Sequence, residues 1–229
     1  MAKKLGMPDL LFKMDGLGGS VPLWIMEVSF SWAKDEVMSS ICRYAMECKD
    51  VQVITIIDTC KSQPHKMPKD ISDLTITMEG RIWLTLKEWK VVSDNPAFGP
   101  VMSSVPHQWA SPLTIKVKTW LCHPDREFSL DKMNSSSYYV CVEICPTRDS
   151  AEIAHLNSVF HQAMKLICDK ITGYVQKHCE LDEENLSAMR KWIPPDPLFN
   201  WDKVVNHVRK GMLYDGFDWY CDWHVNLKY

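Results

Sequence analysis

The chain has 229 residues, of which 46% are hydrophobic and 24% are charged, values that are ordinary for a globular protein. Its formal net charge of −3 argues against a protein whose whole surface grips nucleic acid, although a local basic groove is compatible with this average. No apolar run approaches the roughly 18 residues of a membrane span, and no apolar segment follows the basic N-terminus as it does in a secretory signal.

The first half of the chain predicts strands that alternate with a helix. A short strand over 10–14 ends in a glycine-rich turn, and the nearly continuous apolar run over 22–30 is typical of a strand at the centre of a sheet. Apolar positions at helical spacing predict a helix over 34–47, and β-branched residues predict a second buried strand over 51–57. This strand–helix–strand order predicts that the two buried strands are parallel.

The middle of the chain predicts four more strands. Two strands over 74–78 and 81–92 flank a Glu-Gly pair and are expected to form a hairpin. Residues 93–112 carry four prolines and are expected to form a loop. Two further strands are predicted over 113–121 and 138–145.

Beyond residue 150 the pattern becomes helical. A strong apolar periodicity predicts a helix over 151–172, and weaker signals predict helices over 182–192 and 201–213. We therefore predict an α/β or α+β fold in which residues 1–150 form a central mixed sheet with flanking helices. Residues 151–229 are expected to form a helical region that packs on this core.

The nine cysteines have irregular spacings, and none of them forms a Cys-x-x-Cys pair. A disulfide framework is typical of smaller secreted chains, so the pattern favours reduced thiols. The sequence thus predicts an intracellular protein, cytoplasmic or nuclear, that is neither secreted nor embedded in a membrane.

Glu27 is the one charged residue in the apolar strand over 22–30. A buried carboxylate is costly unless it is paired or binds a cation. Asp9 lies at the start of the preceding strand, and if the two strands are neighbours, the two carboxylates converge. Two oxygen ligands completed by waters suit Mg²⁺ or Mn²⁺. Two plainer interpretations stay open: Glu27 pairs with a lysine or caps backbone amides, and Asp9 forms a turn after proline.

Pro8-Asp9 and Glu27-Val28-Ser29, followed by a helix and a buried strand, resemble the motif of the PD-(D/E)xK nuclease superfamily, and in particular its fungal proteins of unknown function. The stretches "PLWIMEVSFSW", "VQVITIID" and "ITMEGRIWLTLKEW" fit that pattern, and the similarity covers roughly residues 7–92. The resemblance implies a restriction-endonuclease-like sheet and hydrolysis of DNA phosphodiesters. It also implies that Asp9 and Glu27 hold Mg²⁺ or Mn²⁺ as catalytic acids.

The chain departs from the superfamily pattern in two places. The motif lysine would fall at position 29, where this chain has Ser29, so Lys34 on the next helix is the predicted stand-in and Lys13 a second one. The superfamily core usually begins with a helix before Pro-Asp, but only six residues precede Met7, which predicts a shortened N-terminus.

These departures keep a second interpretation open. The chain is then a catalytically inactive copy of the nuclease fold that binds a protein or nucleic acid. In that case we expect the aromatic stretch over 214–223 to be the contact surface.

Overall fold

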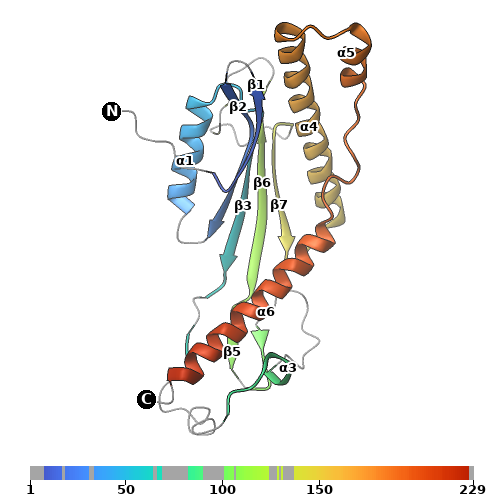
Figure 1. Ribbon diagram of the computed structural model, residues 1–229. Coiled ribbons are helices and arrows are strands. Elements are labelled where there is room, and N and C mark those ends of the chain that lie inside the picture. Colours follow the sequence, from blue (N-terminus) through green and yellow to red (C-terminus); the bar gives the residue numbers. More distant parts are fainter. Residues whose placement is uncertain are drawn as a thin grey trace, which may run out of the picture. The chain divides into compact units, whose positions relative to one another are not determined.

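The structure is a computed structural model that describes residues 8–16, 19–30, 34–63, 66–68, 82–89, 101–105, 107–123, 128, 130 and 137–226. The chain divides into two compact units (Figure 1). The first unit comprises Met1–Thr59 and Ile115–Phe199, and the second comprises Cys60–Thr114 and Asn200–Tyr229. The predicted helical region is therefore shared between the units, while a boundary at residue 150 stays a prediction.

A five-stranded mixed sheet forms the centre of the first unit, with the strand order β1-β2-β3-β6-β7. The strands are β1 (Leu10–Gly16), β2 (Gly19–Phe30), β3 (Val53–Lys61), β6 (Leu113–Leu121) and β7 (Tyr139–Cys145). β1 pairs with β2 antiparallel, β2 with β3 parallel, and β6 with β7 antiparallel. The mixed α+β fold and the parallel pair of buried strands are thus confirmed.

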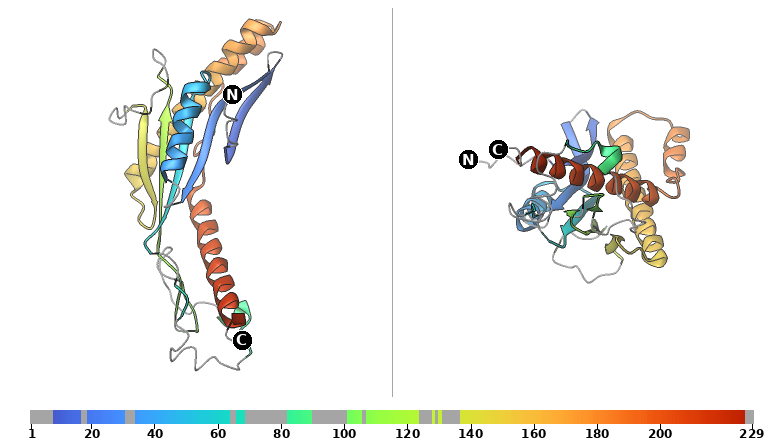
Figure 2. Two further views of the ribbon diagram at one scale, coloured as in Figure 1. Left: turned by 90° about the vertical axis from the view of Figure 1, so that its left-hand side faces the viewer. Right: turned by 90° about the horizontal axis from the view of Figure 1, so that it is seen from below.

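Helix α1 (Lys34–Glu47) covers one face of this sheet, and the predicted bounds of the helix are confirmed (Figure 2). Because side chains alternate along a strand, every second residue of β2 and β3 points toward this helix. The resulting core contains Ile25, Ile41, Tyr44, Val51, Ile54, Ile56, Trp120 and Leu130. Glu27 belongs to the same alternation as Ile25, so the sheet presents its carboxyl on the α1 side.

Helix α4 (Ser150–His178) packs on the opposite face and is followed by the short helix α5 (Glu183–Arg190). The Asp149 carboxylate caps α4 by accepting from the backbone N–H groups of Ala151 and Glu152, which sets the start of the helix. The Trp24 ring of β2 lies 5.5 Å from that of Phe160 on α4. The Trp24 indole N–H donates to the Thr55 hydroxyl at 3.0 Å, so this polar atom is paired inside the core.

The second unit is held by aromatic residues. Its elements are α3 (Leu86–Trp89), β4 (Val101–Met102), β5 (Gln108–Ala110) and α6 (Trp201–Asn226). Five buried residues form the core, namely Trp89, Val105, Trp109, Tyr220 and Trp223. The backbone N–H of Leu84 donates to the Tyr220 hydroxyl at 2.9 Å. The helix predicted over 201–213 continues to Asn226, and Tyr220 and Trp223 of the continuation pack in this core.

The strand predicted over 81–92 is wrong in its described part. Residues 82–85 are irregular, and 86–89 form the helix α3. The physical reason is a capping box: the Glu88 carboxylate accepts from the Thr85 backbone N–H at 2.8 Å and from its hydroxyl at 2.7 Å. The partner strand predicted over 74–78 lies outside the described residues. The loop predicted over 93–112 contains the short β4–β5 pair.

Candidate functional site

Asp9 and Glu27 lie together in the first unit. The register that pairs Leu10 with Met26 brings the start of β1 alongside the middle of β2. The Val28 backbone N–H donates to Asp9 Oδ2 at 2.7 Å, and the Glu27 carboxyl forms hydrogen bonds with Asp9 as well. The fold therefore brings the two predicted site acids into direct contact, while their catalytic and metal-binding roles stay predictions.

The electrostatics of this pair are unusual for surface carboxyl groups. Burial, followed by the negative charge of Asp9 and a hydrogen bond to it, raises the pKa of Glu27 to about 7 from an ordinary 4.5. A hydrogen bond from the Tyr44 hydroxyl on α1 acts in the opposite direction. Below about pH 7 the Glu27 carboxyl therefore keeps its proton in the folded chain.

The arrangement fits a divalent cation with oxygen ligands. A cation at the two carboxyl groups would take the place of the Glu27 proton and offset the repulsion between two negative charges. In the described parts of the chain, no group of three or more His, Cys, Asp or Glu side chains is arranged to hold a metal ion. Asp9 and Glu27 would thus be the side-chain ligands, and waters would complete the coordination sphere, as Mg²⁺ commonly allows.

Ser29 stands at the position where the resemblance would place a lysine, and it is buried. It lies two residues beyond Glu27 on the same side of β2, and only 1% of it is exposed. Among the described residues, its hydroxyl has no hydrogen-bond partner. A buried serine hydroxyl carries no positive charge, so position 29 itself cannot stabilise a negatively charged transition state.

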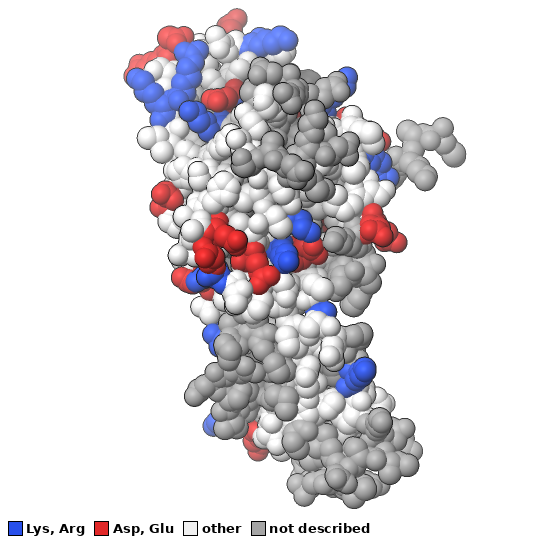
Figure 3. Space-filling model, turned by 180° about the vertical axis from the view of Figure 1, so that it is seen from behind, with Lys and Arg blue, Asp and Glu red and all other residues white. Residues whose placement is uncertain are grey.

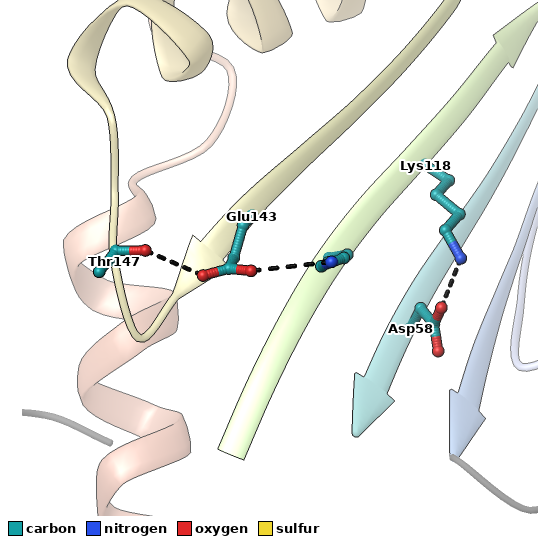
Figure 4. A network of polar contacts seen from close by, with 5 residues as sticks. Asp58, Lys118, Glu143 and Thr147 are labelled. Atoms are coloured by element: carbon teal, nitrogen blue, oxygen red, sulfur yellow. Dashed lines mark hydrogen bonds and ion pairs between the residues drawn. The ribbon is translucent and has the colours of Figure 1, made fainter. Parts of the chain in front are cut away.

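The amine of Lys118, on β6, lies on the same side of the sheet as Ser29. Asp58 on β3 stands opposite Ser29 in the parallel register, and the Asp58 carboxylate forms an ion pair with Lys118. Figure 4 shows the two side chains pointing toward each other from oppositely directed strands. In the same network, Glu143 on β7 accepts from the Thr147 hydroxyl at 2.9 Å and lies 3.8 Å from Lys116. The pairs thus form a row of charges across three strands.

The sequence analysis did not identify Lys118 as a candidate site residue, although the alternation of charged and apolar residues along its strand was visible. Lys116 and Lys118 alternate with Ile115 and Val117 on a strand whose other side is buried, so both amines point to one face. Of the predicted amines, Lys13 forms an ion pair with Asp15 at 3.3 Å on the exposed part of β1. Lys34 is the first residue of α1, and its side chain lies outside the described part of the structure.

The aromatic stretch over 214–223 is divided between the core and the surface. Tyr220 and Trp223 are buried in the second unit, whereas Tyr214 and Trp219 are exposed. The two exposed rings are five positions apart on α6, a rotation of about 140° around the helix axis. They therefore do not share one helix face, and the stretch is not a single aromatic surface.

Charged residues on the face drawn in Figure 3 are of both signs and intermixed. This face therefore presents no continuous basic surface over its described residues. None of the helices in the described ranges combines the length and the apolar character that a membrane span needs.

Comparisons with protein-family models, with curated proteins and with solved structures found no match to the chain.

Replacing Glu27 by glutamine is expected to change how stability depends on pH. The folded chain keeps the Glu27 proton up to about pH 7, whereas the unfolded chain loses it near 4.5. Between these values the folded chain binds more protons, so the wild-type free energy of unfolding falls as the pH rises. Glutamine donates to Asp9 at every pH and removes this loss.

We expect E27Q to be about 1–2 kcal/mol more stable than wild type at pH 8 and equal to it at pH 4.5, a magnitude reduced because Glu27 is only half-buried. Urea unfolding at both pH values measures the difference. Glu47→Gln, an exposed acid at the end of α1, is the control and should not change between them. Equal stability of E27Q and wild type at pH 8 would contradict the raised pKa of Glu27.

Proposed function

We propose that the chain is a nuclease-like protein of the PD-(D/E)xK type, with a restriction-endonuclease-like sheet, and that it hydrolyses DNA phosphodiesters with Mg²⁺ or Mn²⁺. The observation that carries the proposal is the convergence of Asp9 and Glu27 from two adjacent strands. Two acids from neighbouring strands give a divalent cation its oxygen ligands, and the bound ion supplies activation of water and stabilisation of charge on the phosphate.

The residues of the chain have separable roles in this proposal. The Val28 N–H holds the Asp9 carboxylate in a fixed orientation, which limits its reorganisation when a cation binds. Glu27 loses its proton near neutral pH and becomes a full anionic ligand only above that range. Lys34 is the predicted amine, and Lys118 is a second candidate because its ion pair with Asp58 lies beside Ser29.

A second candidate function is binding without hydrolysis, in which the chain is a catalytically inactive copy of the fold that binds a protein or nucleic acid. The buried Ser29 favours it, because a hydroxyl neither deprotonates water nor stabilises negative charge as an ammonium group does. The two candidates share the Asp9–Glu27 pair and differ in whether an amine completes the site.

Nicking of supercoiled plasmid in Mg²⁺ or Mn²⁺ separates the two candidates. We expect wild type to nick, Asp9→Asn to lose activity by at least about 100-fold, and the exposed control Asp215→Asn to keep it. Lys34→Met and Lys118→Met then identify the amine, since only the functional one abolishes nicking while metal binding is retained. Metal binding by wild type without nicking would overturn hydrolysis and favour the inactive copy.

A further inference from the structure

Strand β1 forms one end of the five-stranded sheet, with β2 as its neighbour there (Figure 2). Its outer edge carries backbone N–H and C=O groups that can pair with another strand. Three consecutive apolar residues on it are exposed: Leu10 by 59%, Leu11 by 39% and Phe12 by 47%. Natural sheets usually keep apolar residues off such an edge, so three exposed apolar residues in a row on β1 favour a partner strand.

An apolar groove adjoins this edge. Its volume is about 460 Å³, and Phe12 of β1 forms one wall. Ile167 and Ile171 of α4 form another wall, and Met189 and Trp192 from the region of α5 complete it. Phe12 thus belongs both to the edge strand and to the wall of the groove.

The charged residues of β1 can pair with those of a second copy of the same strand. Lys13 and Asp15 lie on one side of the strand, with 46% and 68% of their side chains exposed. When two β1 strands run antiparallel and centre on Met14, Lys13 of each copy faces the partner's Asp15. The two-fold axis repeats this attraction, so one register contains two pairs of opposite charge.

On the other side of the strand, this register places Phe12 of each copy opposite the partner's Gly16. Gly16 leaves room for the Tyr174 ring of its own chain, because a Cβ added at this position would lie only 2.9 Å from Tyr174 Cζ. The irregularity in the β1–β2 pairing places the extra residue, Leu23, on β2. The outer edge of β1 therefore remains regular.

We propose that two copies of this chain associate antiparallel through β1 and join their sheets into one continuous sheet. The occupant of the edge is a second copy, since the exposed Lys13 and Asp15 side chains are complementary in one register of this strand with itself. A strand from another protein would not in general carry charges that match Lys13 and Asp15. An apolar molecule in the groove would not pair with these two side chains. The proposal does not rest on the nuclease function.

Sedimentation of the full chain over a range of concentrations tests the association. We expect wild type to approach twice the mass of one chain, and Lys13→Asp and Asp15→Lys each to raise the dimer dissociation constant by at least roughly tenfold, because two attractive pairs become repulsive. An equimolar mixture of the two variants should dimerise again, since each pair then has opposite charges. Lys203→Asp on α6 is the control for a charge change elsewhere and should dimerise like wild type.

The mixture keeps the test independent of folding, because a variant that failed to fold would not regain dimerisation on mixing. Wild type that stays monomeric at every concentration would overturn the proposal. So would a wild-type dimer that persists unchanged in both variants, since its interface would then lie elsewhere. Binding of a hydrophobic dye to the groove of a monomeric wild type would indicate a small apolar ligand instead.

Discussion

Alanine at Glu27 is expected to abolish Mn²⁺ binding. The wild-type site offers the Asp9 and Glu27 carboxyl groups side by side, and the Val28 N–H fixes the first of them. Removing one of only two side-chain ligands leaves a single carboxylate, which does not hold a divalent cation against water. Loss of a residue that merely supports a ligand costs 10–100-fold in affinity, so we expect the loss at pH 8 to exceed roughly 100-fold.

Titration calorimetry of matched variants measures this loss. Asp9→Asn should lose binding as Glu27→Ala does, while Glu47→Ala, which removes an exposed acid at the end of α1, should bind like wild type. Circular dichroism of each variant checks that the fold is retained. Binding that persists in both Glu27→Ala and Asp9→Asn would place the cation at another site and would contradict the proposal.

Alanine at Trp109 is expected to destabilise the second unit by about 3–5 kcal/mol, the range for replacing a fully buried tryptophan. Trp109 is 0% exposed, and its ring lies 5.3 Å from that of Tyr220 and 5.4 Å from that of Trp223. Its indole N–H donates to the Val105 carbonyl at 3.3 Å. The substitution leaves a cavity among aromatic rings of α6 and β5 that cannot collapse without moving both elements.

Urea unfolding followed by near-ultraviolet circular dichroism reports on this aromatic core. Trp83→Ala is the matched control, because it removes the same side chain from a half-exposed position in the same unit. We expect the control to change the free energy of unfolding by less than about 0.5 kcal/mol. Equal effects of the two substitutions would mean that Trp109 does not support the core as its burial implies.

The first part of the fold could be predicted because each local signal agreed with the tertiary structure. The apolar run of β2, the helical spacing of α1 and the β-branched residues of β3 each decide their own element. Their short connections then favour parallel pairing. The convergence of Asp9 and Glu27 followed from one further assumption, that β1 and β2 are neighbours, and the register of the hairpin confirms that assumption.

Other features were not predicted because they depend on contacts across the sheet or on competing local signals. The capping box at Thr85 and Glu88 favours a helix where the apolar pattern favours a strand. The continuation of α6 depends on the burial of Tyr220 and Trp223 against β5. The ion pair between Asp58 and Lys118 joins residues 60 positions apart, and their meeting requires the strand order to be known.

The most direct test of the account is a Mn²⁺ titration of wild type at pH 8 and at pH 5.5. Because the pKa of Glu27 is about 7, the deprotonated fraction falls about thirtyfold between these pH values. We expect one site per chain, with affinity lower at pH 5.5 by a similar factor and with a proton released on binding in the neutral range. No binding at pH 8, or binding of equal strength at both pH values, would contradict a cation site built on Asp9 and Glu27.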